Sequence, residues 1–251
     1  MGFGYLLLNT YLILMFFTGV IATEIRQNFF HSDIRYDNLL PISEALQSFN
    51  ASSVTECASN CFRETGCVSL FYKEEQCIGW DTRMDDIFPT IISTDTRYYE
   101  LRGIYGNVAA GRPAVQSTLF PAFSGTYWAF KAVDGSRYPV AFAPDDSCSC
   151  TLMPSLEWWR VDLVNTYLIT DVAILKRRDD LFGVTITNIS IDIAPSVGGP
   201  YTNCYTTGPT FNTMRFETFT CGTPVTGRYV KLSKLVVTYL CLCEVEIYVQ
   251  A

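Results

Sequence analysis

The distribution of ten cysteines constrains this 251-residue chain more than any other feature of its sequence. Four of them lie close together, between Cys57 and Cys77, whereas the other six are spread from Cys148 to Cys243. An even number at this density is typical of disulfides formed in an oxidising compartment. Because the two groups differ so much in spacing, they predict two disulfide-bonded modules that meet near Gly103.

The first 22 residues explain the compartment, because they form an uncharged, apolar segment that ends in small residues such as Val20 and Ala22. This pattern indicates a signal peptide at 1–22 and a secreted, extracellular protein. A signal anchor is the alternative, since the apolar run is close to the length that spans a bilayer. No second run of that length follows, so we expect no membrane insertion after cleavage and predict domains at 23–102 and 103–251.

The charge balance excludes several classes of function. Lys and Arg number 18 against 25 Asp and Glu, for a net charge of −7, which argues against a nucleic-acid-binding surface. The chain has one histidine, His31, so a metal site built from three imidazoles is excluded. No motif pairs two carboxylates or places a nucleophile beside a base, and we therefore predict that the protein is not an enzyme.

Apolar periodicity predicts a mainly β protein. Residues 184–194 and 241–249 alternate between apolar and polar side chains, as strands with one buried face do. Turn residues separate these runs, and an antiparallel β-sandwich or jelly roll fits the second half. The first half carries one helical signal, because Cys57 and Cys61 are four residues apart and Ser52, Ser53 or Thr55 can cap a helix there. We expect a small α+β module.

The spacing C-x3-C-x5-C-x9-C, followed by an apolar IGW, resembles the PAN/apple domain over roughly 24–101. The resemblance implies nested disulfides that join Cys57 to Cys77 and Cys61 to Cys67. Members of this family bind proteins or carbohydrates through surfaces that vary between members. We therefore assign no binding residue in this half of the chain.

The second half resembles the F-type lectin (fucolectin) domain, over about 104–250. This domain belongs to the discoidin-like (coagulation factor 5/8 type C) jelly rolls, which implies the same fold here and a carbohydrate ligand. The motifs that carry the resemblance are NVAAGRPAVQST (107–118), KAVDGS (131–136), CSCT (148–151), WWRVDL (158–163), KRRDD (176–180) and LCEVEIY (242–248).

The resemblance to F-type lectins also implies a Ca²⁺ ion as cofactor, held by oxygen ligands. The alternative is that Asp134 and Gly135 only form a turn and that Glu244 lies at a rim. The implied ligands are the side chains of Asp134, Ser136, Ser147 and Glu244 and the main-chain carbonyls of Lys131 and Cys243.

The sugar-binding residues of F-type lectins are only partly present. Arg177 and Asp179 match the family's Arg-x-Asp, but Cys150 occupies the position of its histidine. Gly183 and Val184 stand where a second basic residue is expected, and Arg178 can replace that residue only if the loop is rebuilt. The sequence therefore predicts a fucose site that is partly degenerate.

The two C-x-C pairs explain what replaced the histidine. Facing residues in antiparallel strands have a constant sum of residue numbers, and Cys148 with Cys243 shares its sum with Cys150 and Cys241. The register thus fits two stacked bridges, and a thiol or zinc site is the rival interpretation. The lectin resemblance supports Cys148–Cys243 and Cys204–Cys221, so that Cys150–Cys241 is an addition.

Two sequons, at Asn50 and Asn188, predict N-glycosylation in a secreted chain. Together the motifs predict a secreted, calcium-dependent carbohydrate-binding protein with a partly degenerate fucose site. The alternative is an extracellular protein-interaction or matrix module that keeps the lectin scaffold without binding sugar. The expected partner is a cell-surface or extracellular glycan, or a protein ligand, and the sequence leaves room for an oligomer.

Overall fold

The computed structural model describes residues 30–102, 106–121, 127–140, 147–178, 187–209 and 216–250. The chain divides into two units, one of Met1–Asp81 with Pro89–Gly103 and one of Thr82–Phe88 with Ile104–Ala251. The predicted signal peptide at 1–22 lies outside the described residues. Within those residues, no helix combines the length and the hydropathy that a membrane span requires.

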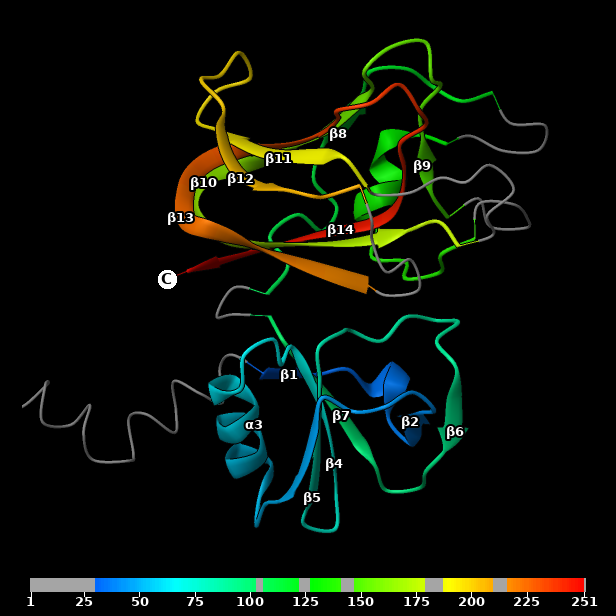
Figure 1. Ribbon diagram of the computed structural model, residues 1–251, viewed down its shortest axis with the longest axis vertical. Helices are drawn as coiled ribbons and strands as arrows, with labels where there is room; N and C mark the ends of the chain where they lie inside the picture. Colours follow the sequence, from blue (N-terminus) through cyan, green and yellow to red (C-terminus); the bar gives the residue numbers. More distant parts are fainter. Residues whose placement is uncertain are drawn as a thin grey trace, which may run out of the picture. The chain divides into compact units, whose positions relative to one another are not determined.

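In its described residues, the first unit is built on a five-stranded antiparallel sheet with the order β1-β7-β4-β5-β3, together with a separate β2–β6 pair and the α-helix α3 (Figure 1). The elements are β1 (Phe30–Ser32), the 3₁₀ helix η1 (Ile34–Tyr36), β2 (Leu39–Pro41), β3 (Gln47–Asn50), α3 (Val54–Arg63), β4 (Ser69–Lys73), β5 (Gln76–Trp80), β6 (Thr90–Ile92) and β7 (Arg97–Leu101).

Two hydrogen bonds between Glu56 and the two serines before the helix cap the start of α3. The backbone N–H of Glu56 donates to the Ser53 hydroxyl at 3.2 Å, and the Glu56 carboxylate accepts from the backbone of Ser52 at 2.8 Å. Ser53 is thus the N-cap, and the arrangement resembles a capping box in which the Glu56 carboxylate reaches the residue before the N-cap. The buried face of the helix carries Cys57 and Cys61, which form disulfides with Cys77 and Cys67 and so link the helix to the sheet. These are the expected pairs.

The second unit contains a seven-stranded sheet with the order β12-β11-β13-β10-β14-β9, in which β8 also pairs with β10. All of these pairs are antiparallel. The elements are β8 (Ala114–Gln116), the 3₁₀ helix η2 (Ala129–Val133), β9 (Ser149–Cys150), β10 (Trp158–Lys176), β11 (Ile189–Ala194), β12 (Thr202–Thr206), β13 (Phe216–Lys234) and β14 (Cys241–Gln250).

The long strands β10 and β13 bend part-way, so that one sheet folds into two layers (Figure 1). Their pairing shifts register between Asp162 and Tyr167, where Val164 has a φ of 70°. Opposite this irregularity lies Gly227, whose missing side chain makes room, because a Cβ there would come within 2.4 Å of Ile193. The apolar core between the layers has a sandwich-like form, which confirms the mainly β prediction.

A short segment, Thr82–Phe88, belongs to the second unit although it precedes the predicted boundary at 102. Arg83 forms an antiparallel bridge with Phe216, and Asp86 N–H donates to the carbonyl of Arg137 at 3.1 Å. Thr82, Arg83, Met84 and Asp85 are all buried. The expectation that 23–102 forms one module is therefore wrong for these residues, because their side chains pack with residues far along the chain.

Candidate functional site

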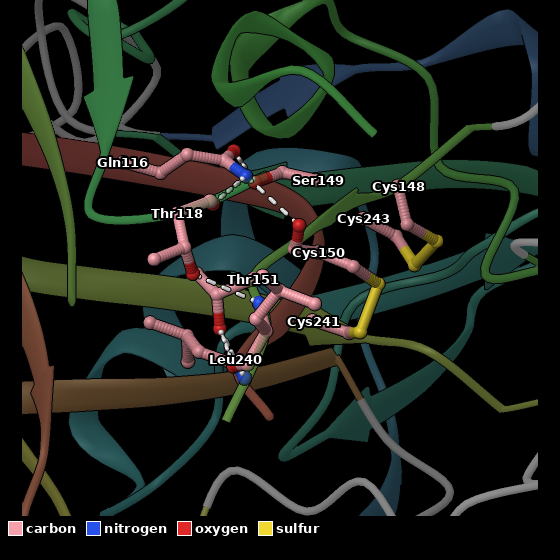
Figure 2. Close-up of a disulfide and its surroundings, with 10 residues drawn as sticks. Gln116, Thr118, Cys148, Ser149, Cys150, Thr151, Leu240, Cys241 and Cys243 are labelled. Carbon is pink, nitrogen blue, oxygen red and sulfur yellow. Dashed lines mark hydrogen bonds between the residues drawn. A yellow bond between two sulfur atoms is a disulfide. The ribbon is translucent and has the colours of Figure 1, made fainter. Parts of the chain in front are cut away.

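The centre of the site is a pair of adjacent disulfides between β9 and β14, shown in Figure 2. Cys148 bonds to Cys243 and Cys150 to Cys241, with Cα–Cα distances of 3.8 and 4.1 Å. Cys150 and Cys241 also face each other directly in the strand register. The predicted stacked bridges are thus present, and the structure holds no free cysteine among its described residues for a thiol or zinc site.

The surroundings of Cys150 are closed by hydrogen bonds (Figure 2). The Gln116 amide donates to the carbonyl of Cys150 at 2.8 Å and to that of Thr118 at 2.7 Å, while the Ser149 hydroxyl donates to the Gln116 amide oxygen. Phe120 N–H donates to the same Cys150 carbonyl at 3.0 Å. Cys150 is 1% exposed, so this position offers no side-chain donor to a ligand.

The segment that follows β10 contains the candidate sugar-binding residues. Arg177 is 3% exposed and packed within the protein, whereas Asp179 lies outside the described residues, as do Gly183 and Val184. Arg178 donates twice to the carboxylate of Asp85, at 2.9 and 2.6 Å, and the two side chains are 3% and 0% exposed.

This pair corrects the expectation for Arg178. Its guanidinium is buried against Asp85, so it does not replace the missing basic residue on the surface. Burial raises the pKa of Asp85 above its usual value, although the charge of Arg178 opposes that rise. The pair could not be predicted from the sequence, because its two partners are 93 residues apart.

The candidate calcium ligands lie on two main segments of the chain, the turn after η2 and strand β14, and a hydrogen bond from Gly135 to Glu244 connects them. The turn after η2 places the Gly135 N–H 3.2 Å from Oε2 of Glu244, and Asp134 accepts from the Ser136 N–H at 2.9 Å. Ser147 and Glu244 are each next to a cysteine of the Cys148–Cys243 bridge, which holds their strands together. The Ser147 hydroxyl oxygen lies 2.7 and 2.8 Å from the carbonyls of Tyr138 and Val140.

Glu244 is the electrostatic centre of this group. It is fully buried, and its Oε1 has no hydrogen-bond partner among the described residues. Burial raises the pKa of Glu244 well above its usual range, and the charges of Glu246 and Asp134 raise it further. Burial also raises the pKa of Asp134. The two carboxylates are therefore close enough for the charge of one to disfavour ionisation of the other.

The remaining expected ligands, Lys131 and Cys243, lie in η2 and β14, and each would contribute only its carbonyl. Among the described residues, no three His, Cys, Asp or Glu side chains gather as a metal site would require. Any cation at Glu244 must therefore take most of its ligands from hydroxyl and carbonyl oxygens. This donor set suits Ca²⁺ better than a transition metal.

A buried ion pair between Arg137 and Glu246, two residues along β14 from Glu244, was not predicted from the sequence. Arg137 donates to both carboxylate oxygens of Glu246, at 2.7 and 2.9 Å, and its guanidinium also lies 4.9 Å from the ring of Phe216. The alternation of β14 could have revealed it, because Glu244 and Glu246 occupy the same face of a strand that is buried on both faces. Two acids on one buried face require partners of opposite charge.

Comparison with known proteins identifies the second unit. The family model of the NedA-like, galactose-binding domain matches residues 131–232. Fucolectin-6 of Anguilla japonica is 36% identical over 154 residues, which cover 60% of this chain and 79% of that protein. Fucolectin of Anguilla anguilla is 34% identical over 147 residues, with coverage of 57% and 90%.

A solved structure shows the same fold. It is the fucolectin from Morone saxatilis (striped bass) serum, which is 23% identical with a TM-score of 0.50 and covers 74% of this chain and 72% of that one. The expected likeness of the second half to F-type lectins is therefore confirmed, and through it the chain belongs to the fucolectin family.

Proposed function

We propose that this protein is a secreted, calcium-dependent lectin whose ligand is no longer simple fucose. One observation supports the proposal: the Cys150–Cys241 bridge occupies the expected histidine position, while Glu244, on the same strand, keeps a buried carboxylate oxygen with no hydrogen-bond partner among the described residues. Family membership supports carbohydrate binding. The altered donor set supports a change of specificity.

The loss of fucose affinity follows from the missing donors. A hydrogen bond to a charged group contributes about 1.5–3 kcal/mol, which corresponds to about tenfold to more than a hundredfold in affinity. Cys150 offers no such bond, and Arg178 is engaged with Asp85. Arg177 is as deeply buried as Arg178, so Asp179 is the anchor that remains, and we infer that it acts on a glycan that supplies contacts beyond one fucose residue.

Calcium fits the group around Glu244. The partnerless Oε1 of Glu244, the carboxylate of Asp134 and the hydroxyls of Ser136 and Ser147 are hard oxygen donors of the kind that Ca²⁺ takes. Lys131 and Cys243 would add carbonyls. When bound, the ion would neutralise the two carboxylates and tie the turn after η2 to β14.

A glycan array with and without chelator tests this function. We expect binding to one or more branched or extended glycans, with little signal for free fucose, and loss of binding in EGTA. Asp179→Asn should abolish the signal, and the adjacent Asp180→Asn serves as the matched control. Binding that survives both EGTA and Asp179→Asn would contradict the proposal.

A protein-interaction or matrix module is the second candidate, and the burial of Arg178 favours it. A scaffold that retains its calcium group while closing its sugar site can still present loops to a protein. Blank arrays, together with a melting temperature that still depends on calcium, would support this candidate over the first.

The first unit supports a PAN/apple-like assignment, which we also propose. Helix α3 and the segment beside it carry the two nested disulfides that the resemblance implies, and the unit also contains a five-stranded antiparallel sheet. Such a module would bind a protein or a carbohydrate. The direct test is a pull-down that compares the wild-type chain with variants in which exposed residues of the first unit are substituted.

Secretion and glycosylation remain predictions that the structure accommodates. Five disulfides with no free cysteine among the described residues suit an oxidising compartment. Asn50 is exposed at the end of β3. Asn188 is half-buried, and its backbone donates to Gly208 and accepts from Leu235. Mass spectrometry after glycosidase treatment would test both sequons.

A further inference from the structure

One outward face of the sheet in the second unit carries cations and aromatic rings in alternation. Trp158 and Arg160 project from β10, whereas their neighbours Trp159 and Val161 are fully buried in the core. The partner strand β13 adds Tyr229 and Lys231, and Arg160 faces Lys231 in the register. We call this the basic aromatic face; its members are Trp158, Arg160, Tyr201, Tyr229 and Lys231.

The rings hold the two cations in place. The guanidinium of Arg160 lies 5.5 Å from the ring centre of Trp158 and 5.7 Å from that of Tyr229. The ammonium of Lys231 lies 5.2 Å from Trp158 and 5.6 Å from Tyr201. Cation–π contacts act within about 6 Å, so both charges are ordered without being neutralised.

The charges of the basic aromatic face are not balanced by ion pairs. Arg160 makes one hydrogen bond, of 3.4 Å, to the carbonyl of Val197, and no salt bridge joins Arg160 or Lys231 to a carboxylate among the described residues. Their remaining N–H donors are therefore free for a ligand. Because the whole chain carries a net charge of −7, this concentration of unpaired cations is local.

Two carboxylates border the basic aromatic face, and each has other partners. Asp162 is held by Arg228 at 2.6 and 2.7 Å, which neutralises it. Asp192 faces Lys231 in the register and accepts from Ser190 at 2.8 Å and from Asn203 at 2.9 Å. The centre of the face, between Trp158 and Lys231, thus keeps its positive charge.

We propose that the basic aromatic face binds an acidic polysaccharide, one that carries sulfate or carboxylate groups. The rings of Trp158 and Tyr229 offer apolar surfaces for the C–H face of a pyranose, and Arg160 and Lys231 offer donors to the acidic groups beside it. Residues two apart on one strand are about 7 Å apart, so the ligand must be a chain rather than one sugar.

This inference does not depend on the candidate site at Cys150. The basic aromatic face uses the first part of β10 and the last part of β13, whereas the disulfides join β9 to β14, and β14 pairs with the later part of β10. A blank glycan array would therefore not contradict polysaccharide binding by the basic aromatic face. Absence of binding to dextran sulfate would likewise not contradict the lectin proposal.

The experiment measures binding of the full secreted chain to immobilised dextran sulfate, with neutral dextran as reference. We expect micromolar binding that weakens as salt is raised and is absent on dextran. Arg160→Gln with Lys231→Gln should weaken it by about a hundredfold, at about tenfold for each charged contact. Trp158→Leu, which keeps an apolar side chain, should weaken binding without changing its salt dependence.

The control removes the same charges elsewhere: Arg97→Gln with Lys73→Gln, both on the first unit, should leave binding unchanged. Circular dichroism and thermal melting identify any variant that fails to fold, and Arg160→Lys then provides a milder test with the charge kept. Equal losses in the control pair, or binding that survives the Arg160 and Lys231 substitutions, would overturn the proposal. Equal binding to duplex DNA or to phosphatidylserine vesicles would overturn its assignment to a polysaccharide.

Discussion

Two neighbouring regions on β9 and β14 differ in how their polar groups are satisfied. Around Glu244, a fully buried carboxylate oxygen has no hydrogen-bond partner among the described residues. Around Cys150, a disulfide and the Gln116 amide close the surface. The candidate anchor Arg178 is likewise paired internally, with Asp85.

The two regions differ in whether their buried polar groups have partners within the chain. A buried charge without a partner is costly, so its persistence indicates that something outside the chain completes it. A polar group that has acquired an internal partner has lost that need. This contrast is why we propose calcium at Glu244 but a changed sugar specificity at Cys150.

The largest expected effect comes from breaking the internal pair. Asp85→Ala leaves the Arg178 guanidinium buried and unpaired, which should lower the free energy of unfolding by about 3–5 kcal/mol. Urea denaturation measures it, with the exposed Glu44→Ala as control. Asp85→Leu combined with Arg178→Met should recover most of the loss, because apolar side chains need no partner. A loss below 1 kcal/mol in Asp85→Ala would show that Arg178 has another partner.

Removal of the Cys150–Cys241 disulfide should have the next largest effect on stability. Cys150→Ser with Cys241→Ser opens a bridge between residues 91 apart and should cost about 2–4 kcal/mol. Cys150→His with Cys241→Ser should cost a similar amount and also gain weak fucose binding, measured by calorimetry with calcium present. If the folded Cys150→His, Cys241→Ser variant binds no fucose, the disulfide is not the reason that the wild-type chain lacks fucose affinity.

Calcium should stabilise the other region by mass action. At a free concentration a hundredfold above its Kd, the ion should add about 2.7 kcal/mol to the free energy of unfolding. EGTA should therefore lower the melting temperature, and Glu244→Gln should remove the difference between the two conditions. Glu44→Gln is the control. A calcium-independent melting temperature in the wild-type chain would contradict the contrast drawn between the two regions.

The smallest expected effect on stability comes from breaking an ion pair at the surface, which contrasts with the buried pair of Arg178 and Asp85. Asp162 and Arg228 form a similar bidentate pair, but their side chains are 24% and 38% exposed. Asp162→Asn should cost at most about 1 kcal/mol at neutral pH. The hydrogen bond from Arg228 lowers the pKa of Asp162 to about 2 from 3.8, so the folded state binds fewer protons. The stabilisation is thus present above pH 3.8 and is lost as the pH falls towards 2. Unfolding curves from pH 7 to pH 2 measure it.

Local pattern explains why much of the cysteine framework could be predicted from the sequence. The strand period of two places Cys148 and Cys150 on one face and fixes their register against Cys243 and Cys241. The nested bridges of the first unit followed from family spacing. Asp134 and Glu244 were named as candidate calcium ligands from the resemblance to F-type lectins, because both lie in the short, continuous motifs that carry it.

The pairing of Arg178 with Asp85 could not be predicted, because no periodicity relates residues that are 93 apart. The same holds for Arg137 with Glu246, which are 109 apart. Each pair forms only because burial excludes water and makes an unpaired charge costly. The basic aromatic face needs tertiary structure too, since Tyr201 joins it from outside the two strands that carry the rest.

The sequence by itself thus indicated the β architecture through the alternation of strand faces, and the family and the disulfide pairs through its resemblance to known families and the register of the two C-x-C pairs. The tertiary structure alone decided which charged side chains pair with each other and which do not. The physical reason is that a side chain's solvation depends on everything packed around it. Residues 82–88 supply part of that surrounding from the far side of the predicted boundary.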